Sequence, residues 1–181
     1  VGRVAGGIGA VGGDAGIART RHRGGEYFLR FKPADFWHGW ISLTYGRSFR
    51  QRRPEWKWTP SPLDRPVLIS IVNYYRLPRR YEVGVKYRLQ SGLPYTEVSL
   101  GNAIQKVGPY NGKRYYPYQA FDFRFSKGFA GPHGKGHVYF EAWNAFNWPN
   151  MVLTDSKTRG FRGLSFNLPA TILFAGVDYD I

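Results

Sequence analysis

The chain has 181 residues and no cysteine, and its 26 Lys and Arg against 12 Asp and Glu give a formal net charge of +14. This length suits one domain, and the absence of cysteine excludes thiolate catalysis, disulfides and cysteine-ligated metals. Aromatic residues make up 18% of the chain, which argues against disorder, and no run approaches the roughly 20 apolar residues of a membrane-spanning helix.

The chain opens with a glycine-rich stretch, residues 1–24, which we expect to be a loop or a frayed strand because glycine weakens strand pairing. After it, apolar and polar side chains alternate with a period of two, which is the pattern of a strand with one apolar face. The segments with this pattern are 26–32, 37–48, 67–77, 81–90, 121–127, 137–143 and 171–181. The sequence therefore predicts an all-β fold.

The links between these strands alternate strictly between short and long. The short links cover residues 32–36, 77–81 and 128–136, and the long links cover 48–65, 93–117 and 148–170. Antiparallel barrels of the outer membrane have short periplasmic turns and long external loops. The alternation of short and long links favours an antiparallel transmembrane β-barrel of about seven or eight strands over residues 25–181. A soluble antiparallel sandwich or barrel is the alternative, because its core would also need one apolar face.

Several motifs, in their order along the chain, resemble the C-terminal β-barrel portion of a TonB-dependent outer-membrane receptor. They are Tyr-x-Arg-Ser, Asp-Arg-Pro, Tyr-Arg-Leu-Pro, Ser-Gly-x-Pro-Tyr and Asn-x-Phe-Asn, at residues 45–48, 64–66, 75–78, 91–95 and 144–147. The resemblance implies the C-terminal part of a larger, 22-stranded barrel that takes up a metal chelate or an oligosaccharide. It also implies that TonB is contacted only through a plug domain that is not in this chain.

We therefore expect a fragment of a receptor in the bacterial outer membrane. Seven strands are an odd number and cannot close an antiparallel barrel. The alternative is a self-standing small barrel of eight strands, with residues 1–24 supplying the eighth and with an anchoring or adhesion role.

The positive charge has a different explanation in each class of protein. In a soluble protein, arginines interleaved with aromatics at residues 50–58 would suit single-stranded nucleic acid. In a barrel the same segment is an external loop that meets the phosphates of lipopolysaccharide, and we expect no nucleic-acid partner. A second basic group on the polar strand faces is predicted to face the lumen, either as an ordinary charged wall or as an attractant for anionic ligands. It comprises Arg30, Lys32, Lys86, Arg88 and Arg124.

No catalytic or metal-ligating pattern is visible, so we expect neither an enzyme nor a cofactor. The four histidines have no second ligand at a usual spacing. The acidic residues Asp122, Glu141 and Asp178 are most simply explained as salt partners of the basic residues.

Two further groups of residues are candidates for function. The aromatics of the external loops could stack on a sugar or an aromatic chelator, or could pack the loops together; they are Trp56, Trp58, Tyr95, Tyr110, Tyr115 and Tyr116. At the C-terminus, Gly176, Tyr179 and Ile181 resemble the signal by which the barrel-assembly machinery recognises its clients, although a terminal Phe is more usual. The side chains expected to face outer-membrane lipid include Tyr27, Ile41, Val83, Val85, Phe123, Phe140 and Leu173.

Overall fold

The structure is a computed structural model, and it describes residues 3–4, 7–10, 18–101, 104–131, 134–150 and 171–180. The described residues contain β-strands, one short 3₁₀ turn, η1 (Pro78–Arg80), and no α-helix. None of them forms a helix long and apolar enough to cross a membrane. The all-β prediction is confirmed.

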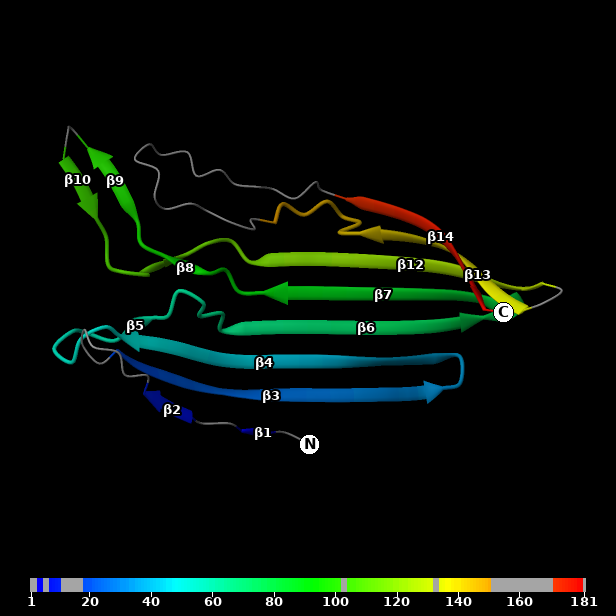
Figure 1. Cartoon of the computed structure of the whole chain (residues 1–181), viewed down its shortest axis with the longest axis horizontal. Helices are drawn as coiled ribbons and strands as arrows, with labels where there is room; N and C mark the ends of the chain where they lie inside the picture. The colour runs from blue at the N-terminus through cyan, green and yellow to red at the C-terminus, as the bar shows by residue number, and fades with distance from the viewer. Residues whose placement is uncertain are drawn as a thin grey trace. The chain divides into compact units, whose positions relative to one another are not determined.

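Eight strands follow one another in a single antiparallel sheet, in the order β1-β3-β4-β6-β7-β12-β13-β14 (Figure 1). Their bounds are β1 (Arg3–Val4), β3 (Arg19–Ala34), β4 (Trp37–Gln51), β6 (Val67–Leu77), β7 (Tyr81–Gln90), β12 (Tyr118–Gly131), β13 (Gly134–Trp143) and β14 (Ile172–Asp180). Each of the seven segments with period-two alternation overlaps one of the seven long strands, which confirms where the strands lie. Several strands are longer than predicted, and β3 also includes residues 19–24 of the glycine-rich stretch.

The first residues of the chain add to one edge of this sheet. β1 pairs antiparallel with β3, with Arg3 opposite Glu26. β2 (Gly7–Ala10) pairs with β3 in the same register, with Gly7 opposite His22. In the described part of the chain, β14 pairs with β13 alone, so the strand order has two ends. The described strands thus form an open antiparallel sheet and do not close into a barrel.

Two compact units share these strands. Unit 1 comprises residues 1–27, 43–68 and 90–117, and unit 2 comprises residues 28–42, 69–89 and 118–181. Unit 1 also contains four short loop strands and the end of β4 that pairs with β5 (Thr59–Pro60). The loop strands form two pairs, β8 (Pro94–Tyr95) with β11 (Lys113–Arg114) and β9 (Val98–Gly101) with β10 (Ile104–Val107).

The short links are tighter than the sequence predicts. β3 and β4 are separated only by residues 35–36, and β12 and β13 only by residues 132–133. Between β6 and β7, Arg79 and Arg80 both have left-handed backbones, with φ of 61° and 64°, and the Tyr81 N–H donates to the Pro78 carbonyl. Two successive left-handed residues give a turn whose twist matches that of the flanking antiparallel strands.

One face of the sheet in unit 2, here called the apolar face, is joined by contacts between aromatic rings. Trp37 packs against Phe31 and stacks on Tyr75, with centroids 5.8 Å and 5.9 Å apart. Tyr81 stacks on Phe125 with centroids 5.5 Å apart. Because side chains alternate along a strand, the neighbouring positions of β4, β6, β7 and β12 lie on the opposite face, called the polar face.

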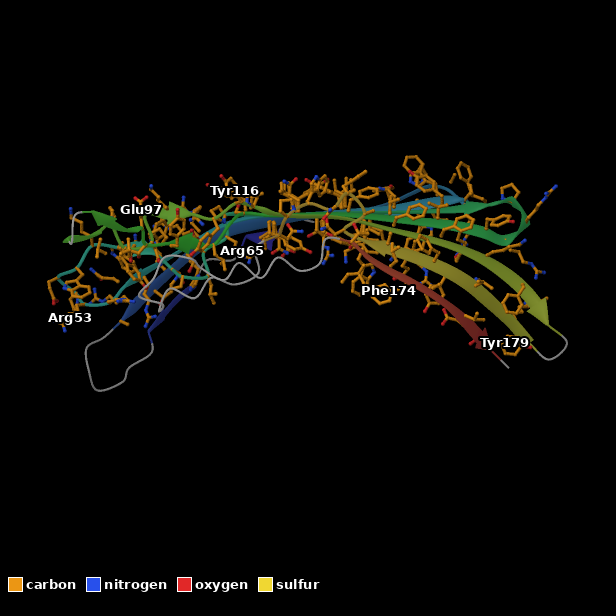
Figure 2. All side chains as sticks on the ribbon, turned by 90° about the horizontal axis from the view of Figure 1, so that it is seen from above. Arg53, Arg65, Glu97, Tyr116, Phe174 and Tyr179 are labelled. Atoms are coloured by element: carbon orange, nitrogen blue, oxygen red, sulfur yellow. The ribbon has the colours of Figure 1, made fainter. Side chains whose placement is uncertain are left out.

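The apolar face is exposed. Leu173 and Val177, on this face of β14, have 62% and 63% of their surface exposed, and among the described residues the only buried apolar side chains are Val72, Ala120 and Ala142. Figure 2 shows side chains on both sides of the strands, with Phe174 and Tyr179 labelled on β14. The described residues therefore have almost no hydrophobic core, which is unusual for a water-soluble domain.

Candidate functional site

Among the described residues of unit 1, the most deeply buried charge is Asp64, in the loop between β4 and β6, with 1% of its side chain exposed. Its carboxylate accepts hydrogen bonds from the Ser48 N–H and from the Arg114 guanidinium, and it lies 3.4 Å from Arg47 Nε. Arg114 also donates to the carbonyl of Gly92 at 3.2 Å. One carboxylate, with its arginines, thus joins the end of β4 to the two long loops of unit 1. We call this group the Asp64 clamp.

Buried amide side chains order the same loops. Asn111 has a left-handed backbone, with φ of 53°, which asparagine tolerates better than most residues. Its N–H donates to Thr96 Oγ1 at 2.9 Å, and its Nδ2 donates to the carbonyl of Pro60 at 2.8 Å. Gln51 donates to the carbonyl of Trp56 at 2.8 Å. The loops of unit 1 are therefore cross-linked to one another rather than free.

The loop tyrosines form contacts within the loops, with one exception. Tyr95 and Tyr115 stack with ring centroids 4.3 Å apart. Arg52 donates to the Tyr110 hydroxyl at 2.6 Å and places its guanidinium 4.2 Å from the ring centre. Tyr116, by contrast, has 86% of its surface exposed. Of these four tyrosines, Tyr116 offers the freest ring to a ligand.

The two loop tryptophans each lie against an arginine. The Arg53 guanidinium lies 5.2 Å from the ring centre of Trp56, and that of Arg21 lies 4.8 Å from the ring centre of Trp58. Such cation–π pairs contribute about 0.5 to 1 kcal/mol at exposed sites. Both rings therefore have a partner within unit 1, which the loop position alone did not predict.

On the polar face of unit 2, Arg124 is the centre of a charged group. The β12–β13 register places it opposite Glu141, to which it donates a hydrogen bond. Its guanidinium also lies 3.6 Å from Asp178 and 4.2 Å from the ring centre of Tyr139. The arginine is thus held between carboxylates from the two following strands.

Arg88 forms a second pair beside it. Its Nη2 donates to Asp122 Oδ2 at 2.8 Å, and Asp122 also accepts the Asn144 N–H at 3.0 Å. Lys86, Arg88 and Arg124 line one concavity of about 400 Å³. Trp40 and Tyr74 are also part of its lining. Three of the five predicted lumen-facing residues are therefore brought together.

The other two predicted basic residues lie on β3 and do not line this concavity. Arg30 and Lys32 flank Phe31, whose ring belongs to the apolar face, so their side chains alternate onto the polar face. Lys32 Nζ lies 2.8 Å from Oδ1 of Asp35, which is in the turn. The hydrogen bond that Lys32 donates there holds the pKa of Asp35 below its usual range.

Two residues of the predicted assembly signal, Gly176 and Tyr179, lie on the C-terminal strand β14. Gly176 lies opposite Tyr139 on β13, and a Cβ added to it would lie 2.5 Å from the Tyr139 hydroxyl, so a larger residue there would require the Tyr139 ring to shift. Tyr179 stacks on Phe129 with centroids 6.1 Å apart. Ile181 lies outside the described residues.

The described residues contain no group of three or more His, Cys, Asp or Glu side chains that could hold a metal ion. The described residues offer paired charges on the polar face of unit 2 and cross-linked loops in unit 1. Comparison with protein-family models, curated proteins and solved structures finds no match. The functional conclusion therefore rests on the sheet and its loops.

Proposed function

We propose that this chain forms part of the wall of a bacterial outer-membrane β-barrel, a TonB-dependent receptor for the uptake of a metal chelate or an oligosaccharide. The observation that carries the proposal is the separation of the two faces in unit 2. One face is apolar and exposed, and the other holds ion pairs such as Arg88–Asp122. A lipid bilayer on one side and a watery lumen on the other require this separation.

Strand length supports the same proposal. A tilted strand crosses a bilayer in about 9–11 residues, and the seven long strands have between 9 and 16 residues. In a bilayer the backbone groups of an edge strand would have no partner, so only closed barrels are stable there. The strands at the two ends of the described strand order therefore need partners, which further strands would supply in a larger barrel to which this chain contributes its C-terminal part.

The role in uptake comes from the ordered motifs and from the loops. Two of the motifs, Asp-Arg-Pro and Tyr-x-Arg-Ser, supply Asp64 and Arg47 of the Asp64 clamp, which holds the long loops in one arrangement. Such loops keep a binding surface preorganised for a bulky ligand. Outer-membrane lipid, lipopolysaccharide and the barrel-assembly machinery are the partners of this proposal, and TonB acts through a plug outside this chain.

One observation favours a second function, that of a self-standing small barrel with an anchoring or adhesion role. With β1, the sheet has eight strands, which is an even number and the smallest known for closed outer-membrane barrels. Closing β14 onto β1 would then complete the barrel without further strands.

The size of the protein in the outer membrane tests both functions. An antibody against the loop at residues 50–58 is expected to detect, in isolated outer membranes, a protein several times larger than 20.7 kDa whose gel mobility changes on boiling. A heat-modifiable protein of about 20.7 kDa would establish the small barrel instead. Recovery of the protein only from the soluble fraction would contradict both functions.

A further inference from the structure

The concavity of about 400 Å³ on the polar face lies within unit 2 alone, and residues of five neighbouring strands line it: β4, β6, β7, β12 and β13. Ligand pockets in proteins commonly have volumes of about 300 to 1,000 Å³. One of its rings, that of Tyr74, is held in place, because it stacks on His38 with centroids 5.5 Å apart and lies over Gly84. The concavity therefore has the size and the ordered lining of a ligand site.

Exposed aromatic rings lie beside the charges of this face. Trp143, which lines the concavity, has 47% of its surface exposed, and Phe174 has 41%. The two ring centroids lie 4.8 Å apart, and the Trp143 indole N–H donates to Glu141 at 3.0 Å. Contiguous exposed rings that are rimmed by polar residues are typical of ligand-binding grooves.

The charges around the concavity are nearly balanced. The two arginines that line it, Arg88 and Arg124, pair with three carboxylates. The third cation of the lining, Lys86, has no carboxylate within ion-pair distance among the described residues. Three cations thus lie beside three carboxylates, and an anionic metal chelate would gain little net attraction here.

Paired carboxylates and guanidiniums suit a neutral ligand with many hydroxyl groups. A hydroxyl group donates to a carboxylate oxygen and accepts from a guanidinium N–H, and such charge-assisted hydrogen bonds are stronger than those between neutral groups. The rings of Tyr74 and Trp143 offer flat apolar surfaces to the C–H groups of a sugar ring. The same lining therefore matches both the hydroxyl edge and the apolar face of a sugar.

The width of the concavity indicates an elongated ligand. Trp40 lies on β4 and Trp143 on β13, at the two sides of the lining. Four strand spacings separate these strands in the sheet order, which corresponds to about 19 Å at the usual spacing of about 4.8 Å. A ligand that contacts both tryptophans is therefore a chain of sugars and not a single one.

We propose that this concavity is a substrate site of the receptor wall and that its substrate is a neutral oligosaccharide, with sugar rings on the tryptophans and hydroxyl groups on the ion pairs. The inference rests on the proposed function, in which the polar face lines the lumen, and it narrows the two substrate classes given there to one.

The test uses the outer-membrane protein that contains this chain, purified in a neutral detergent. Its binding to an array of neutral and acidic oligosaccharides, and to ferric catecholate and ferric hydroxamate chelates, is measured. A neutral oligosaccharide is expected to bind, and Trp143→Leu is expected to lower its affinity about tenfold, because the ring surface is lost. Raising the ionic strength from about 0.05 M to about 0.5 M is expected to leave the affinity unchanged, because the ligand carries no charge.

Phe140→Leu is the matched control. Phe140 lies on the same strand as Trp143 and has 41% of its surface exposed, but it lies on the opposite face because the two positions differ by an odd number. It is expected to bind the oligosaccharide with unchanged affinity. Heat-modifiable gel mobility shows that each variant is folded, and Trp40→Leu replaces Trp143→Leu if the latter does not fold.

Three results would overturn the inference. They are the binding of no neutral oligosaccharide, equal affinities of the tryptophan variant and Phe140→Leu, and an affinity for the oligosaccharide that falls steeply with ionic strength. In all three the protein has been purified from the outer membrane, so the proposed location in a barrel wall stands, and binding of a ferric chelate would leave the receptor function in place. Recovery of the protein only from the soluble fraction would overturn the proposed function and the inference together.

Discussion

Replacing Asp64 with asparagine is expected to raise the rate at which trypsin cleaves the long loops on intact cells by about a hundredfold. The substitution keeps the shape of the side chain and removes its charge. Arg114 and Arg47 then lose their common counter-ion, and the carboxylate that accepts the Ser48 N–H becomes a neutral amide. The loops of unit 1 should therefore open far more often.

The magnitude follows from the burial of the group. Removing one partner of a buried ion pair costs roughly 3 to 5 kcal/mol. Because the side chains of Arg114 and Arg47 keep 29% and 38% of their surface exposed, we expect the lower end, about 3 kcal/mol for the opening of the loops. Cleavage through an open form follows its population, so about 3 kcal/mol corresponds to about a hundredfold.

Asp35 provides the matched control. It also pairs with a cation, Lys32, but 99% of its side chain is exposed, and surface pairs of this kind contribute little. Asp35→Asn is therefore expected to leave the cleavage rate unchanged. An Asp64→Asn protein with the cleavage rate of the unsubstituted protein would show that the clamp does not hold the loops.

Replacing Ile41 with arginine is expected to destabilise the membrane-embedded protein by about 2 to 4 kcal/mol. Ile41 lies on the same face of β4 as Trp37, five residues from the end of the short turn, which is about halfway across a bilayer. In the proposed barrel, the charge would therefore face hydrocarbon at its most costly depth. Urea titrations of the protein folded into lipid vesicles measure the change.

A substitution of the next residue, Ser42, shows whether any arginine in this part of β4 destabilises the protein. Ser42 lies on the polar face with His38, which stacks on Tyr74. Ser42→Arg is expected to change stability by less than about 0.5 kcal/mol, as for other surface substitutions. Equal destabilisation by both substitutions would contradict the assignment of the two faces.

The sequence predicts the strands well because strand periodicity is a local property. The alternation in Tyr81–Gln90 corresponds to β7 at the same bounds. The pairing of Arg124 with Glu141 and Asp178 also follows once the strands are neighbours, since opposite positions share a face. The predicted turn at 128–136 is too long because glycine does not stop an antiparallel hairpin from pairing up to its last residues.

The Asp64 clamp and the contact of Arg21 with Trp58 could not be predicted from local pattern. Asp64 and Arg114 are 50 residues apart, in two loops without periodicity, so no spacing connects them. Arg21 lies on β3, and Trp58 lies in the loop that follows β4. The two side chains meet because β3 and β4 are neighbours in the sheet. The number of strands needed for closure likewise depends on pairing at the sheet edges, which side-chain alternation does not encode.

Single cysteines placed along β7 test the central claim, that the apolar face lies in lipid. The chain has no cysteine, so a spin label at each position of Tyr81–Gln90 reports only its own surroundings. In the protein reconstituted into vesicles, labels at Val83 and Val85 are expected to be most accessible to oxygen, which dissolves in lipid. Labels at Glu82 and Lys86 should be most accessible to a water-soluble nickel chelate. Labels at Val83 and Val85 that neither reagent reaches, as in a packed protein core, would contradict the account.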